Sequence, residues 1–286
     1  MPTHALADLH LHTTASDGRL TPTQLVRLCA QRGLRVIAIT DHDTTHGLAE
    51  ARAESERHPQ LTLIPGVEFS TDVPGDEIHV LGYFLSHEDM GLQEVLERFR
   101  RGRIERAQAI LERLHSFGMD IAWERVLEIT GGASSVGRPH IAQAMLEKGY
   151  VSSLKEAFDR WIGRTGPAYV EREKFVPADT VHFICQHGGV PVLAHPRDIR
   201  DLPRWLRELK EAGLAGMEVY YGDYTPDQVN ALLGLAKEHS LIPTGGSDYH
   251  AFSTPGEVEP GSVGPPWEVV ERLLALGKVP VPKGDV

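Results

Sequence analysis

Hydrophobic and polar positions follow two different patterns along this chain. In residues 1–88 and again in residues 170–286, short apolar runs alternate with amphipathic stretches, which is typical of βα units around a mainly parallel sheet. The predicted strands are Ala5–His12, Arg35–Thr40, Leu61–Phe69, Ile78–Phe84, Val190–Ala194, Met217–Tyr221 and Ile242–Thr244, with a turn at Pro74-Gly75. Helices are predicted after Thr21-Pro22, at Leu48–His58 and at Asp227–His239.

Residues 89–169 have a helical pattern throughout. The predicted helices are Leu92–Phe117, Trp123–Thr130, Pro139–Lys148 and Leu154–Gly163. The sequence therefore predicts an α/β domain built from residues 1–88 and 170–286, interrupted by a helical insertion at 89–169.

Composition and charge exclude several classes of protein. The 286 residues carry a formal net charge of −11, which argues against broad docking on a nucleic-acid backbone. No apolar run approaches the roughly 18 residues of a membrane span, and the start of the chain does not resemble a signal peptide. Two cysteines without metal-ligand spacing do not predict a disulfide framework or a thiolate site. We expect a cytoplasmic protein with no membrane contact and no obligate protein partner.

Histidines and carboxylates gather at the ends of the predicted strands. Asp8, His10 and His12 alternate with leucines, so they share one face of a strand. Asp8 is placed to accept the free ring N–H of a ligand histidine. Taken alone, this pattern also fits two buried histidines of an ordinary core.

The same residue types recur at other strand ends, at His42, Glu68, His195, Asp248 and His250, while His79 lies within its strand. Parallel barrels bring the carboxyl ends of their strands to one face. We therefore expect a metal site with more than one ion.

These segments resemble the signature motifs of the PHP (polymerase and histidinol phosphatase) family. The resemblance rests on Asp8–Asp17, Ile39–Asp43, Gly66–Glu68, Ala194–Pro196 and Gly246–His250. It is strongest to bacterial members that act as 3′,5′-nucleotide bisphosphate phosphatases and 5′→3′ exoribonucleases, which have a segment similar to Gly137–Ala142 in a helical insertion. It implies an α/β fold, a distorted (βα)7-type barrel whose insertion forms part of the substrate wall.

The resemblance also implies three divalent metal ions and their ligands. The first ion would take His10, His12, Glu68 and Asp248; the second Glu68, His79 and His195; the third Asp17, His42 and His250. Among these, Glu68, Asp248, His195 and His250 are the expected catalytic residues. Imidazole and carboxylate donors without thiolates suit Mn²⁺, our first expectation, or Fe²⁺ or Zn²⁺. Asp41 is expected to orient a ligand, and the role of Asp43 stays open.

Other charged residues are candidates for substrate contact. Arg138 and His140 begin a predicted helix, where backbone N–H groups favour anions, and Arg197 closely follows His195. Lys174, within a run of charges, is a weaker candidate. The arginines of Arg98–Arg106 are interpreted as a solvated helix face, with guidance of an oligonucleotide as the alternative.

Together these features predict a metal-dependent phosphoesterase. A hydroxide bridging two metals would attack phosphate monoesters of nucleotides, with a nucleoside 3′,5′-bisphosphate as the expected substrate and 5′→3′ cleavage of short RNA as a related activity. The main alternative is a histidinol-phosphate phosphatase. Less favoured alternatives are an amidohydrolase and a non-catalytic PHP module.

Overall fold

The computed structural model describes residues 5–73, 76–131, 135–171, 175–254 and 256–282. The predicted turn at Pro74-Gly75 and the candidate Lys174 lie outside these ranges.

Seven strands form one sheet whose order in space follows the order in the chain. They are β1 (Ala7–Leu11), β2 (Val36–Ile39), β3 (Thr62–Val73), β4 (Asp76–Tyr83), β5 (Val190–Leu193), β6 (Gly216–Tyr221) and β7 (Ile242–Gly246). The last strand returns to the first, since Leu11 and Tyr249 form a parallel bridge and the Asp248 N–H donates to the His10 carbonyl oxygen at 2.9 Å. The predicted barrel is thereby confirmed.

The barrel is distorted because β4 runs antiparallel to both of its neighbours. Two residues separate β3 from β4, and so short a link allows only an antiparallel hairpin. Residues Gly66–Val73 pair with Asp76–Tyr83, and His79 lies opposite Ser70. This reversal explains why His79 enters the site from within its strand rather than from a carboxyl end.

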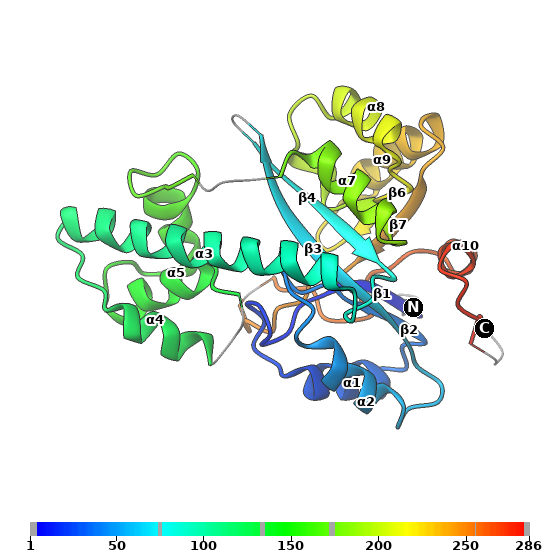
Figure 1. Cartoon of the computed structure of the whole chain (residues 1–286), viewed down its shortest axis with the longest axis horizontal. Coiled ribbons are helices and arrows are strands. Elements are labelled where there is room, and N and C mark those ends of the chain that lie inside the picture. Colours follow the sequence, from blue (N-terminus) through cyan, green and yellow to red (C-terminus); the bar gives the residue numbers. More distant parts are fainter. Residues whose placement is uncertain (1–4, 74–75, 132–134, 172–174, 255, 283–286) are drawn as a thin grey trace.

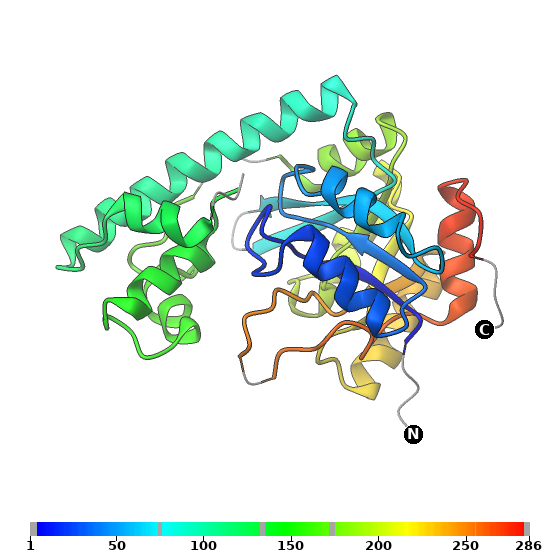
Figure 2. The ribbon, with the colours of Figure 1, turned by 90° about the horizontal axis from the view of Figure 1, so that it is seen from below.

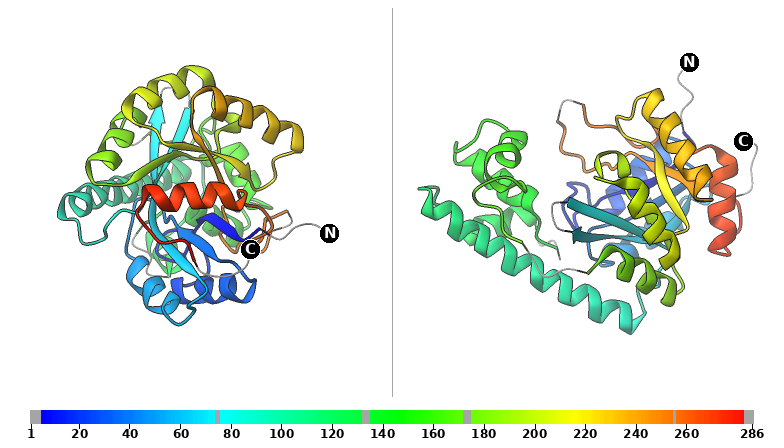
Figure 3. Two further views of the ribbon diagram at one scale, coloured as in Figure 1. Left: turned by 90° about the vertical axis from the view of Figure 1, so that its right-hand side faces the viewer. Right: turned by 90° about the horizontal axis from the view of Figure 1, so that it is seen from above.

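Helices surround the sheet and close one of its ends (Figures 1 and 3). The outer helices are α1 (Pro22–Gln31), α2 (Leu48–Ser55), α7 (Pro177–Gln186), α8 (Leu202–Ala212) and α9 (Pro226–Glu238). At the end away from the insertion, α10 (Trp267–Leu276) packs Val270, Leu273 and Leu274 against the strands. The sequence analysis assigned no element to α7, α8 or α10. Within the described ranges, no helix has the length and apolar character that crossing a bilayer requires.

The helices between β4 and α7 have a hydrophobic core of their own. They are α3 (Met90–Ser116), α4 (Trp123–Thr130), α5 (Arg138–Glu147), α6 (Leu154–Ala157) and a π-helical turn at Phe158–Ile162. The second half of α3 contributes Ile110 and Leu114 to this core, whereas the first half packs Leu92 and Phe99 in the core beside β3 and β4. The 27-residue helix α3 therefore belongs to both parts of the molecule (Figure 2).

Candidate active site

The first group of ligand-type side chains joins both ends of the chain. His10 is fully buried on β1, and His12 follows that strand. Their Nε2 atoms lie 3.1 Å apart. Each of these nitrogens lies 3.2–3.3 Å from Glu68 Oε2 and 3.1–3.2 Å from Asp248 Oδ1. Four donor atoms thus surround one point, and they are the set implied for the first ion.

Glu68 extends the cluster through its second oxygen. Glu68 Oε1 lies 2.8 Å from His79 Nδ1 and 3.1 Å from His195 Nε2, and these two nitrogens are 3.2 Å apart. His42 Nδ1 approaches Glu68 Oε2 at 3.0 Å, so His42 also borders this second group. One carboxylate therefore faces both groups, as a bridging ligand would.

The third group is looser. Asp17 Oδ1 lies 3.4 Å from His250 Nε2, and Asp17 Oδ2 lies 3.7 Å from His42 Nε2. The Nδ1 atom of His12 adds a donor that the sequence analysis did not assign here, 3.8 Å from Asp17 Oδ1. All nine predicted ligands thus lie in one connected cluster, with His12 and His42 each facing two groups.

The donor set fits divalent cations better than it fits hydrogen bonding. Asp17 Oδ1, Glu68 Oε2 and Asp248 Oδ1 are buried carboxylate oxygens that accept no hydrogen bond within the described part of the chain, although ring nitrogens lie close to each. Metal–ligand bonds of about 2.0–2.2 Å at tetrahedral or octahedral angles place donor atoms roughly 2.8–3.6 Å apart. The spacings in the first two groups match that range, and unpaired buried carboxylates are costly unless a cation binds them.

Charge in the cluster also favours cations. Burial raises the pKa of Glu68, but the surrounding imidazoles, His42 foremost, hold it well below its usual range. Burial lowers the pKa of His12, yet the adjacent carboxylates of Asp248 and Glu68 outweigh it and raise that pKa to about 10. The carboxylates are thus ionised at neutral pH, and a bound cation replaces the imidazole protons as their counter-charge.

Close packing of β7 on β1 positions two of these ligands. A Cβ atom on Gly246 would lie 2.5 Å from the His10 backbone nitrogen and 2.8 Å from Asp8 Oδ1. Just beyond, Asp248 adopts a positive φ of 55°, and His195 at the end of β5 has a φ of 28°. Such conformations cost about 1–3 kcal/mol each, so the fold holds these ligands in strained backbone.

Glu218 is a buried acidic residue that the sequence analysis missed. Both of its carboxylate oxygens lie 3.1 Å from His10 Nδ1, and Oε2 also accepts from the His195 N–H at 2.8 Å. It is fully buried in β6. The available signal was a single charged residue within an otherwise apolar strand. Glu218 therefore fixes which nitrogen of His10 faces the cluster.

Asp8 does not have this predicted role. Its carboxylate accepts from the backbone N–H groups of Ser247 at 2.9 Å and Gly261 at 3.3 Å. No contact between Asp8 and an imidazole nitrogen occurs among the described residues. The prediction was wrong because Asp8 lies two residues before His10 in β1, further from the strand end. There its carboxylate stabilises the packing of β1 against β7.

Replacing Glu218 tests its influence on the metal ligands. We expect Glu218→Gln to weaken metal affinity by about 10- to 100-fold, because the amide cannot hold the His10 ring with a full negative charge. Titration of metal-stripped protein with Mn²⁺ measures this. Glu54→Gln is the matched control, since Glu54 is a buried carboxylate on α2 that pairs with Arg27. Equal affinities in the two variants would contradict the assignment.

The two aspartates beside His42 hold neighbouring segments. Asp41 accepts from the Thr13 N–H at 2.8 Å and from the Ser16 hydroxyl at 2.6 Å, so it shapes the loop after β1 and contacts no ligand ring directly among the described residues. Ser16 Oγ lies 3.5 Å from His12 Nδ1. Asp41 thus reaches a ligand only through Ser16. Asp43, which the sequence left open, pairs with Arg103 at 2.6 Å.

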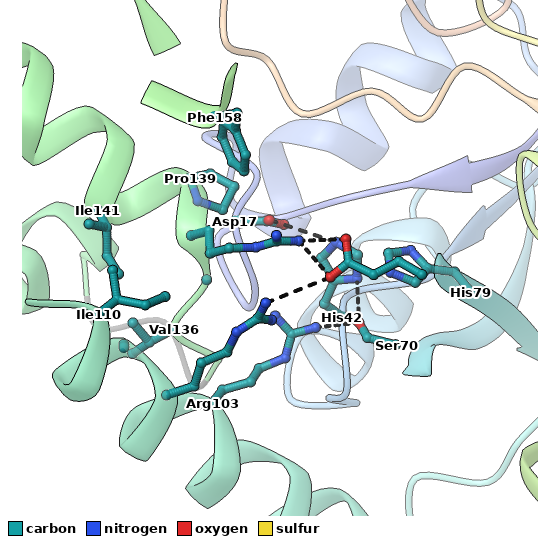
Figure 4. Close-up of a pocket in the computed structure, with 15 residues that line it drawn as sticks. Asp17, His42, Ser70, His79, Arg103, Ile110, Val136, Pro139, Ile141 and Phe158 are labelled. Atoms are coloured by element: carbon teal, nitrogen blue, oxygen red, sulfur yellow. Dashed lines mark hydrogen bonds and ion pairs between the residues drawn. The ribbon is translucent and has the colours of Figure 1, made fainter. Parts of the chain in front are cut away.

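Three hollows adjoin the cluster, and each contains one predicted substrate residue. The insertion-side hollow (Figure 4) is bordered by Asp17, His42, Ser70, Glu77, His79, Arg103, Arg106, Ala107, Ile110, Val136, Gly137, Arg138, Pro139, Ile141 and Phe158. A second hollow reaches Asp17 from the other side of α5 and includes His140, whose Nδ1 accepts from the Gly137 N–H at 3.0 Å. A third, the tyrosine-side hollow, is bordered by Glu77, His195, Arg197, Asp198, Ile199, Tyr221 and Tyr224.

The interpretation of Arg98–Arg106 as a solvated helix face was wrong for part of the helix. The Arg103 side chain is 11% exposed and Arg106 is 10% exposed, and both border the insertion-side hollow. Figure 4 shows Arg103 directed toward Ser70 and His42. Sequence spacing suggested pairs along the helix, but the actual partners Asp43 and Glu77 belong to the barrel.

The remaining missed contact is a tyrosine. The Tyr221 hydroxyl donates to Asp248 Oδ2 at 2.6 Å, which leaves Oδ1 directed at His10 and His12. Tyr221 ends the strand β6. Its position at a strand end indicated that Tyr221 lies at the site. It was not predicted as a site residue because tyrosine is not a typical metal ligand.

Comparisons with known proteins agree with this geometry. The chain is 37% identical over 248 residues to the 5′-3′ exoribonuclease Rnm of Escherichia coli, covering 85% of this chain and 84% of that one. It is 32% identical over 255 residues to the 3′,5′-nucleoside bisphosphate phosphatase of Chromobacterium violaceum, covering 87% and 88%. A Bifidobacterium adolescentis structure described as a metal-dependent phosphoesterase superposes with a TM-score of 0.87 at 30% identity, covering 97% and 98%. The PHP domain model matches residues 8–171, and the chain belongs to the PHP family.

Proposed function

We propose that this protein hydrolyses nucleoside 3′,5′-bisphosphates with three divalent cations, Mn²⁺ foremost, and that short RNA is degraded from its 5′ end at the same site. The observation that carries the proposal is the convergence of nine imidazole and carboxylate side chains, in which one buried oxygen of each carboxylate accepts no hydrogen bond in the described structure. Support for the substrate comes from the names of the exoribonuclease and bisphosphate phosphatase relatives.

One set of side chains would hold the cations, and a second set would hold the substrate. His10, His12, Glu68 and Asp248 would hold one ion, Glu68, His79 and His195 a second, and Asp17, His42 and His250 the third. Cations bound there supply charge for the phosphoryl oxygens and activate water for attack on phosphorus.

Substrate positioning falls to residues around the cluster. Arg138 and Arg197 border two of the hollows beside it and are suited to bind phosphate oxygens. Tyr221 keeps one oxygen of Asp248 aimed at the cations. His140 caps the first turn of α5, and we assign it the placement of Arg138 beside the substrate.

Removing and restoring metal tests the proposal. We expect EDTA to abolish phosphate release from a nucleoside 3′,5′-bisphosphate and Mn²⁺ to restore it, because cations held by the cluster would activate the attacking water. Colorimetric phosphate release and chromatography of short RNA digests measure both activities. Absence of phosphate and of mononucleotides with Mn²⁺, Fe²⁺ and Zn²⁺ would refute the proposal.

The alternatives find less support. A histidinol-phosphate phosphatase would bind a cationic alcohol, yet Arg103, Arg106 and Arg138 border the insertion-side hollow and favour a second anion. An amidohydrolase of the type that the sequence analysis considered would bridge its metals with a modified lysine, whereas Glu68 faces both groups here. The cytoplasmic location stays a prediction.

A further inference from the structure

Glu77 on β4 contacts two arginines of the insertion. Arg138 Nη2 donates to both carboxylate oxygens of Glu77 at 2.7 Å, and Arg106 Nη2 lies 3.8 Å from Glu77 Oε1. Glu77 also borders both the insertion-side and the tyrosine-side hollow. Its carboxylate therefore lies where a substrate spanning the two hollows would pass.

The contact combines strong charge with incomplete geometry. Arg138 Nη2 lies 2.7 Å from Glu77 Oε2, so the guanidinium is the close counter-charge of this carboxylate. Arg138 nevertheless binds it through one nitrogen rather than through the two-nitrogen fork of a bidentate pair. A phosphate, with more charge and three acceptor oxygens, can use that fork fully.

Glu77 differs in this respect from Asp43, the barrel carboxylate that pairs with Arg103. Asp43 is fully buried and is held from two sides, by the Ser70 N–H at 3.0 Å and by Arg103 at 2.6 Å. The Glu77 side chain is 29% exposed. Of these two carboxylates, Glu77 is thus the one that an incoming anion can displace.

We propose that Glu77 is a specificity-determining residue, a displaceable competitor that occupies Arg138 until the second phosphate of the substrate takes its place. The proposal rests on the proposed function, in which one phosphate lies at the metal cluster. Because Glu77 competes for Arg138, it lowers the affinity of Arg138 for any phosphate. It thereby also helps to release a product whose remaining phosphate is bound to Arg138. A substrate with a single phosphate has no group to exchange for Glu77.

The test compares Glu77→Gln with the wild type in the metal-loaded enzyme. We expect KM for a nucleoside 3′,5′-bisphosphate and the inhibition constant of the nucleoside monophosphate product each to fall about fivefold, the upper end for a partly exposed ion pair. KM for 4-nitrophenyl phosphate should change less. Glu259→Gln, which removes a carboxylate that pairs with Arg32 away from the site, controls for net charge.

A double-mutant cycle separates competition at Arg138 from a general loss of repulsion. In an Arg138→Ala background, Glu77→Gln should no longer lower KM for the bisphosphate, since the competed group is absent. An unchanged or raised KM in folded Glu77→Gln, or an equal gain without Arg138, would overturn the proposal. Glu77→Asp, whose shorter carboxylate holds Arg138 less well, replaces Glu77→Gln if thermal unfolding shows that variant to be misfolded.

The outcome is distinguishable from a failure of the proposed function. If the wild type does not hydrolyse the bisphosphate, the proposed function fails. Inorganic pyrophosphate, used as an inhibitor of whichever phosphoester the enzyme cleaves, then tests Glu77 alone. Tighter inhibition of Glu77→Gln than of the wild type by pyrophosphate supports the role of Glu77 as a competitor for Arg138, and equal inhibition refutes that role.

Discussion

Glu68→Gln is expected to lose metal from two groups at once and to reduce turnover by about three orders of magnitude or more. The loss of several kcal/mol of charge stabilisation corresponds to that factor. Glu68 Oε2 faces the first group, and Oε1 faces His79 and His195. An amide can neither bridge two cations nor balance their charge. Metal content by mass spectrometry and steady-state rates with Mn²⁺ measure the effect.

Two further variants make the result specific. Glu208→Gln removes a surface carboxylate of α8 that pairs with Arg204, and it should keep both metal content and rate. Glu68→Asp retains the charge on a shorter side chain and should recover part of the metal. A Glu68→Gln protein that binds as much metal as the wild type would show that Glu68 is no bridge.

Gly246→Ala should destabilise the whole barrel as well as the site. The added Cβ would lie 2.5 Å from the His10 backbone nitrogen and 2.7 Å from the His10 Cβ. Since backbone cannot move aside locally, β7 must separate from β1. We expect a loss of roughly 1–3 kcal/mol or more in the free energy of unfolding, together with weaker metal binding. Thermal and denaturant unfolding with and without Mn²⁺ measure both effects.

A second glycine provides the control. Gly234 lies in α9, and a Cβ there would meet no atom within 4 Å. Gly234→Ala should therefore leave stability unchanged or raise it slightly, because alanine favours helix. A Gly246→Ala protein as stable as Gly234→Ala would show that the packing of β1 against β7 tolerates a side chain.

The strand ends were the most predictable part of the site. Their apolar runs are short and are followed closely by histidine or carboxylate, so a barrel alone determines that His42, His195 and Asp248 meet. Glu68 was predicted at a strand end but lies within β3, which continues to Val73. The position of His79 depends on the antiparallel β3–β4 hairpin, which the sequence indicated only through the predicted turn at Pro74-Gly75. The family resemblance supplied the division of ligands into three groups, which strand position could not.

Contacts between distant surfaces escaped the sequence analysis. Glu218 and Asp8 are both buried carboxylates near His10, and only the register of β1 against β6 and β7 decides which one meets the imidazole. Likewise, Arg103 could pair along its own helix or across to the barrel. Residue spacing describes the first option, whereas the docking of the insertion, which depends on packing, selects the second.

Because α3 contributes to both hydrophobic cores, it limits where the helical insertion can be exchanged for that of a relative. Replacing the insertion from residue 89 onward would remove Leu92, Leu96 and Phe99 from the barrel's core. The barrel would then lose packing as well as the arginines of the insertion. Junctions placed after Phe99 and before Ile104 keep each core intact. Chimeras between relatives are thus best joined within a continuous helix rather than at its ends.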